Sequence, residues 1–152
     1  MTLDLTAEPA IGVYSRVAKL TPGAWQDSAE LRSSFGTSLA ISDDGSTIAV
    51  GDSGDTGRGT GPRAAPLLPD GSFSGAVYIY RLKDTWRLAN MVKPNYLPVV
   101  PGNYSRFGDE VALNGNGQTL IVGQKYESSP TQGIGGDWAI EGASRSGAVW
   151  LY

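Results

Sequence analysis

The chain has 152 residues, a formal net charge of -3, and no cysteine or histidine, which excludes disulfides, zinc fingers and catalysis by thiolate or imidazole groups. Glycine is abundant, with 21 residues, about twice its average share of ~7% in proteins. No apolar run approaches the ~18 residues of a membrane-spanning helix and the basic residues are scattered singly, so we expect neither a membrane span nor nucleic-acid binding.

The N-terminal part is predicted to contain half of a repeating unit. Residues 12–15 resemble residues 76–79, and each of these stretches is followed by a tryptophan, Trp25 in the first case and Trp86 in the second. We therefore expect residues 11–31 to form the last two strands of an earlier unit.

The next stretch is predicted to form four strands, over residues 37–42, 47–51, 75–80 and 86–92. Apolar side chains at every second position, beginning with Leu39 and Ile41, are typical of half-buried strands. In the third strand, Val77 and Ile79 are expected on one face and large aromatic side chains on the other.

A loop of about 23 residues, 52–74, separates the second and third strands. Asp52 and Asp55 are two acids in a glycine-rich part of this loop, and carboxylate oxygens are ligands that calcium prefers. These two residues are the candidate metal ligands, although solvated loop acids explain the pattern as well.

A proline-rich linker at residues 94–101 follows the fourth strand and is expected to be extended. It leads to Asn103, which stands in an Asn-Tyr-Ser tripeptide of the form that accepts N-linked glycans. Asn103 is the candidate glycosylation site, on the condition that the chain follows a secretory route.

The C-terminal part repeats the first unit. Residues 35–80 match residues 107–152 without a gap at a constant offset of 72, with 14 identical positions among 46. We therefore divide the chain into an N-terminal segment with a half-unit, residues 1–34, a first repeat, residues 35–106, and a second, incomplete repeat, residues 107–152. The positions that define the repeat are Phe35, Gly36, Gly45, Gly51 and Gly75, and their counterparts are Phe107, Gly108, Gly117, Gly123 and Gly147.

The second repeat has its own long loop, residues 124–146, at the position equivalent to the first. Loops of this length tend to be functional, and both loops are expected on one face of the molecule. Trp138 lies inside the second loop opposite Pro66 of the first, so it is no repeat position; it is the candidate contact residue for a ligand, and packing within its own loop is the alternative.

The motifs together resemble the FG-GAP repeat of integrin-α-like β-propellers, including bacterial surface proteins of that type. The resemblance rests on Phe35-Gly36, the segment 44–51, the segment 74–80 and Trp86, and on the same motifs from Phe107 to Tyr152. The Gly-Ala-Pro that usually follows the second strand of the family is replaced by residues 51–53 and 123–125. The resemblance implies an all-β fold of antiparallel, four-stranded, propeller-type blades, with two repeats and an N-terminal half-blade.

The resemblance also implies an extracellular or cell-surface protein with a structural or adhesive role, whose ligand would be a cell-surface protein or a glycan. Two blades do not close a propeller, which typically needs 4–8. We therefore expect head-to-tail self-association into a ring or fibre, in which residues 11–31 of one copy follow Tyr152 of another. A piece of a longer propeller is the competing explanation.

Catalysis is not expected, because the chain offers no paired carboxylates in a suitable arrangement. Asp109 and Glu110 are adjacent on a predicted strand, so their side chains point to opposite faces. The alternative function is a calcium-dependent, ligand-binding fragment of a larger integrin-like propeller, with calcium as the implied cofactor.

Overall fold

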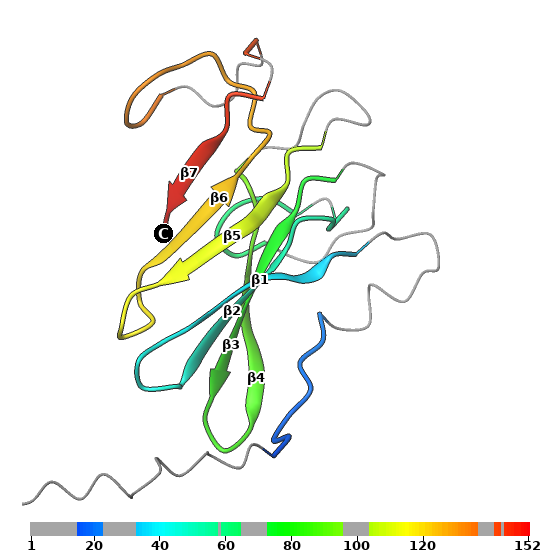
Figure 1. Cartoon of the computed structure of the whole chain (residues 1–152), viewed down its shortest axis with the longest axis vertical. Helices are drawn as coiled ribbons and strands as arrows, with labels where there is room; N and C mark the ends of the chain where they lie inside the picture. Colours follow the sequence, from blue (N-terminus) through cyan, green and yellow to red (C-terminus); the bar gives the residue numbers. More distant parts are fainter. Residues whose placement is uncertain are drawn as a thin grey trace, which may run out of the picture.

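The protein is built from two antiparallel β-sheets, which Figure 1 shows stacked and splayed apart. The computed structural model describes residues 15–22, 33–57, 59–64, 73–95, 104–136, 142–143 and 145–152, and every structural statement concerns these residues. Sheet 1 consists of β1 (Phe35–Ile41), β2 (Thr47–Asp52), β3 (Ala76–Leu82) and β4 (Trp86–Val92), and sheet 2 of β5 (Phe107–Leu113), β6 (Leu120–Gln124) and β7 (Ala148–Leu151). Within the described residues there is no helix, which confirms the all-β prediction, and accordingly none long and apolar enough to cross a membrane.

Sequential strands pair because each hairpin turn holds residues that suit it. Between β1 and β2, the carboxylate of Asp44 accepts hydrogen bonds from Ser42 Oγ at 2.6 Å and from the Ser46 N–H at 2.9 Å. These bonds lower the pKa of Asp44 below its ordinary value. Gly45 supplies the positive φ of 68° that the turn requires, as Gly117 does with 65° in the equivalent turn of sheet 2.

The two sheets repeat each other in backbone geometry at the offset of 72. In β1 the pairing with β2 is irregular between Phe35 and Ser38, and in β5 the pairing with β6 is irregular between Phe107 and Glu110. Four pairs of glycines share a positive φ: 36 and 108, 45 and 117, 61 and 133, and 75 and 147. The repeated glycines therefore mark backbone conformations that other residues adopt at a cost.

Each sheet has an aromatic face and an aliphatic face. On sheet 1 the aromatic face carries Phe35, Val50, Tyr78 and Tyr80, and the aliphatic face carries Ala49, Val77, Ile79 and Val92. On sheet 2 the equivalent aromatic face carries Phe107, Val122, Trp150 and Tyr152, and the equivalent aliphatic face carries Ile121, Val149 and Leu151. The predicted separation of Val77 and Ile79 from the aromatic side chains is confirmed.

The aliphatic face of sheet 1 packs on the aromatic face of sheet 2, and this contact is the main core. Strand β5 lies along β1 and β2, as Figure 1 shows. Phe107, at the start of β5, is completely buried, with its ring edge-on to that of Tyr152 at 6.2 Å. The aromatic face of sheet 1 is partly covered by Leu20, and Thr21 O accepts a hydrogen bond from the Tyr80 hydroxyl at 2.7 Å.

Two expectations from the sequence need correction or restriction. The alternation in β1 predicted that Leu39 and Ile41 are half-buried, but they are 68% and 59% exposed, because nothing in the described chain covers this part of the aromatic face. Their counterparts Val111 and Leu113 are partly buried against sheet 1. Of the predicted half-unit at residues 11–31, residues 15–22 form no strand, and the remainder lies outside the described residues.

Candidate functional site

The two predicted metal ligands lie at the end of β2 and are buried. The Asp52 carboxylate accepts hydrogen bonds from Ser33 Oγ and the Ser34 N–H, both at 2.7 Å. It thereby fastens the segment before β1 to sheet 1. The described residues contain no cluster of three or more acidic, histidine or cysteine side chains that could surround a metal ion.

Asp55 forms a buried ion pair with Lys93, the residue that follows β4. The Asp55 carboxylate also accepts hydrogen bonds from the Tyr78 hydroxyl at 2.8 Å and the Gly57 N–H at 2.9 Å, and Lys93 Nζ donates to Gly75 O at 2.9 Å. Burial alone raises the pKa of Asp55, but the Lys93 ammonium and these hydrogen bonds outweigh it, so the pKa is lowered from its ordinary value. The Lys93 ammonium thus stands where a cation at Asp55 would bind, and calcium binding at this pair stays a prediction.

The equivalent positions of sheet 2 also serve internal hydrogen bonding. Gln124, the counterpart of Asp52, accepts a hydrogen bond from Trp150 Nε1 at 2.6 Å. Glu127, the counterpart of Asp55, accepts hydrogen bonds from the Ser129 N–H at 2.8 Å and from Ser129 Oγ at 3.0 Å. In each long loop, the buried acid three residues after the end of the second strand of its sheet therefore accepts internal hydrogen bonds. The other two candidates, Trp138 and Asn103, lie outside the described residues.

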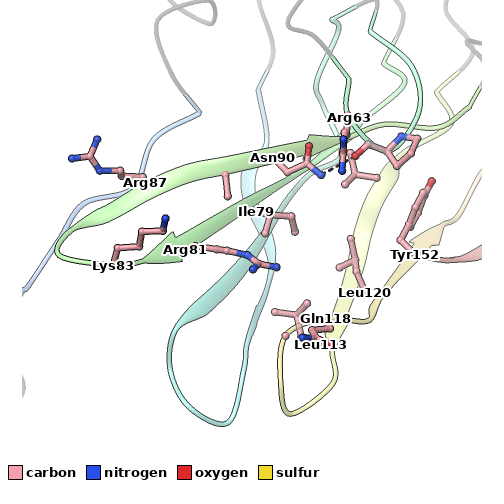
Figure 2. A pocket seen from close by; sticks show the side chains of 14 residues that line it. Arg63, Ile79, Arg81, Lys83, Arg87, Asn90, Leu113, Gln118, Leu120 and Tyr152 are labelled. Atoms are coloured by element: carbon pink, nitrogen blue, oxygen red, sulfur yellow. Dashed lines mark hydrogen bonds between the residues drawn. The ribbon is translucent and has the colours of Figure 1, made fainter.

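A groove of about 730 Å³ opens between the end of the β3–β4 hairpin and the β5–β6 hairpin. Figure 2 shows Arg81 reaching across it toward Gln118 and Leu113, with Lys83 and Arg87 further along the hairpin. Arg63 lies at the other end of the groove, beside Asn90.

The groove is cationic. Four of its described lining residues are basic, none is acidic, and no ion pair joins any of the four to a described carboxylate. The Tyr152 hydroxyl, also in the lining, is buried without a hydrogen-bond partner among the described residues, and burial raises its pKa to about 12, so it remains a neutral donor. The local charge opposes the net charge of -3 of the whole chain and suits an anionic ligand.

A second hollow, of about 680 Å³, lies on the outer side of sheet 2. Gly123, Gln124, Gly147, Ala148 and Val149 line it together with residues at the start of β1 and β5. Beside it, the aliphatic face of sheet 2 is open: Ile121, Val149 and Leu151 are 43%, 74% and 72% exposed. On sheet 1 the equivalent residues Ala49, Val77 and Ile79 are buried under sheet 2.

No protein family, curated protein or solved structure matches this chain. Function must therefore be inferred from the two surfaces that the sequence did not reveal. The available signal for the groove was the alternation of Arg81, near the end of β3, with Lys83, in the turn that follows. For the open face, the signal was the repeat itself, because the residues buried in the first copy recur in the second.

Proposed function

We propose that this chain is a non-enzymatic structural module of FG-GAP type, whose sheets are propeller-type blades and which associates head to tail with copies of itself. A location outside the cell or at its surface, and a role in adhesion, belong to the same proposal. The single observation that carries it is the open aliphatic face of sheet 2, since Val149 and Leu151 are exposed where Val77 and Ile79 are buried. Large exposed apolar surfaces typically mark interaction sites.

Sedimentation velocity of the purified chain over a range of concentrations tests this proposal. We expect species larger than the monomer whose share rises with concentration. A monomer at all concentrations, together with a β-type circular dichroism spectrum, would contradict self-association.

A second candidate function, binding of an anionic glycan, is supported by the cationic groove. Carboxylate or sulfate groups of such a glycan would pair with Arg81, Lys83 and Arg87, which have no ionic partner among the described residues. Calorimetric titration with heparin as the probe tests this, and the variant Arg81→Glu/Arg87→Glu should bind at least about 10-fold more weakly. Arg16→Glu/Lys19→Glu, which reverses two exposed basic residues outside the groove lining, is the matched control; equal binding by both variants would contradict the proposal.

The calcium-dependent alternative predicts that calcium binds at Asp52 and Asp55. Titration with calcium chloride should then give a saturable heat signal, and the variant Asp55→Asn should abolish that signal. The pairing of Asp55 with Lys93 favours the structural interpretation, in which no calcium heat is observed.

A further inference from the structure

The contact between the two sheets provides a template for a contact between two copies. At the start of β5, Phe107 forms a parallel bridge with Gly75, and its N–H donates to Ser74 O at 3.1 Å. A side chain at Gly75 would overlap the backbone of Phe107, and one at Gly51 would overlap the carbonyl of Gly108. The Phe-Gly start of β5 is thus a plug that fits a socket formed by glycines of sheet 1.

The same socket exists on sheet 2 and is open. Its glycines are Gly123 and Gly147, the counterparts of Gly51 and Gly75, and they line the second hollow described above. A Cβ built on Gly147 would meet Lys125 O at no less than 3.4 Å, so no described backbone approaches Gly147 as Phe107 approaches Gly75. Sheet 2 therefore repeats the socket without a plug among the described residues.

The same Phe-Gly plug also opens sheet 1, where Phe35 is only partly buried and Leu20 covers part of the same face. Phe35-Gly36 opens β1 as Phe107-Gly108 opens β5, and the Phe35 N–H makes an exposed hydrogen bond to Ser33 Oγ at 3.2 Å. Further along β1, Leu39 and Ile41 are exposed where their counterparts on β5 pack against sheet 1. Both halves of the template contact are thus present on one chain, the plug on sheet 1 and the socket on sheet 2.

We propose that the socket of sheet 2 receives β1 of a second copy, in the register in which β5 sits on sheet 1. This inference rests on the proposed self-association and adds to it the partner surface and the register. Phe35 of the second copy would lie beside Gly147, and Leu39 and Ile41 would cover the aliphatic face of sheet 2.

One difference between the two contacts bears on affinity. In the template, Ser38 Oγ donates a hydrogen bond to Gly108 O at 2.8 Å, but its counterpart on sheet 2 is Glu110, which cannot donate when ionised. The contact between copies lacks this bond, so we expect it to be weaker than the contact within the chain and reversible on dilution.

Complementation between two variants tests the register. Val149→Asp places a carboxylate in the socket face and Leu39→Asp places one on the plug, and both positions are exposed in the single chain, so folding should be unaffected. Each variant alone should associate at least about 100-fold more weakly than the wild type, because an unpaired carboxylate would be buried in the contact. An equimolar mixture should form dimers and nothing larger, since the intact plug of Val149→Asp fits the intact socket of Leu39→Asp.

Ile134→Asp, at a fully exposed loop position away from the socket lining, is the control and should associate like the wild type. Association of the single variants at wild-type strength, or failure of the mixture to form dimers, would overturn the socket while self-association by another surface stands. A monomeric wild type would overturn both the socket and the proposed function. Urea unfolding of each variant confirms that the chains compared are folded.

Discussion

At the scale of single residues, the most consequential contact is the ion pair of Asp55 and Lys93. The two residues are 38 positions apart, in the long loop and just after β4, and the Tyr78 hydroxyl from β3 joins them. A buried ion pair adds little over an apolar pair of the same shape, but removing one partner leaves the other charge buried and unpaired. The pair therefore specifies where the loop closes on the sheet more than it adds stability.

Lys93→Met should lower the free energy of unfolding by about 3–5 kcal/mol, because Asp55 would stay buried without its counter-charge. Lys83→Met removes the same charge at an exposed position and should change stability by no more than about 0.5 kcal/mol. Urea unfolding followed by tryptophan fluorescence measures both. Equal losses in the two variants would mean that the ion pair has no structural role.

The pKa of Asp55 determines how the difference in the free energy of unfolding between the wild type and Lys93→Met depends on pH. In the wild type that pKa lies below the unfolded value of about 3.9, so the stabilisation is complete above pH ~4 and is lost as the pH falls through the folded-state pKa. In Lys93→Met, burial should raise the same pKa above 3.9, so acidification through it should increase stability. We expect the difference in the free energy of unfolding between the wild type and Lys93→Met to be large at pH 7 and to become smaller toward pH 3. A difference that does not change with pH would contradict this account.

At the scale of strands and sheets, the sequence predicts the positions of the strands better than it predicts which side chains are buried or paired. The four strands of sheet 1 and the three of sheet 2 were predictable from alternation and turn residues, because such signals are local. The burial of Leu39 was mispredicted because it depends on what covers the sheet, and alternation carries no information about that. The pairing of Asp55 with Lys93 and the grouping of Arg63 with Arg81 were equally inaccessible, because both depend on contacts between distant segments.

Gly75 and Gly147 allow two reasons for a glycine to be distinguished, the close approach of another strand and the strain of a positive φ. Both have a positive φ, of 81° and 76°, but only at Gly75 would a Cβ overlap another strand. Gly147→Ala should cost about 1–2 kcal/mol of stability for the backbone conformation. Gly75→Ala should cost about 1–3 kcal/mol more than that, because the backbone of Phe107 must move away from the added methyl group within a packed core.

Thermal or urea unfolding of the two alanine variants measures these costs. Self-association gives a further readout, because Gly147→Ala should weaken it while leaving the fold intact. Equal stability losses in the two variants would show that the approach of Phe107 does not require glycine at position 75.

At the scale of the whole molecule, three surfaces are available for binding, and they rely on two kinds of interaction, apolar and electrostatic. The aliphatic face of sheet 2 and the exposed end of β1 are apolar, whereas the groove at the β3–β4 hairpin is cationic. A plug and a socket on different faces form a heterologous contact, which closes into a ring or continues as a filament according to the rotation per copy. Three copies would supply six sheets, within the range of closed propellers, so a discrete trimer indicates a ring and an open series of sizes indicates a filament.

Temperature and salt should separate the two kinds of surface in one protein sample. Apolar contacts weaken on cooling, so self-association should be weaker near 5 °C than at 25 °C and should change little between 50 mM and 500 mM sodium chloride. Heparin binding in the groove should weaken steeply over the same salt range, because exposed charges are screened within about 10 Å at 0.1 M salt. Sedimentation velocity in the temperature and salt series, with fluorescent heparin as a second signal, measures both effects. Self-association that weakens with salt as steeply as heparin binding would mean that charged groups, and not the aliphatic face, hold the copies together.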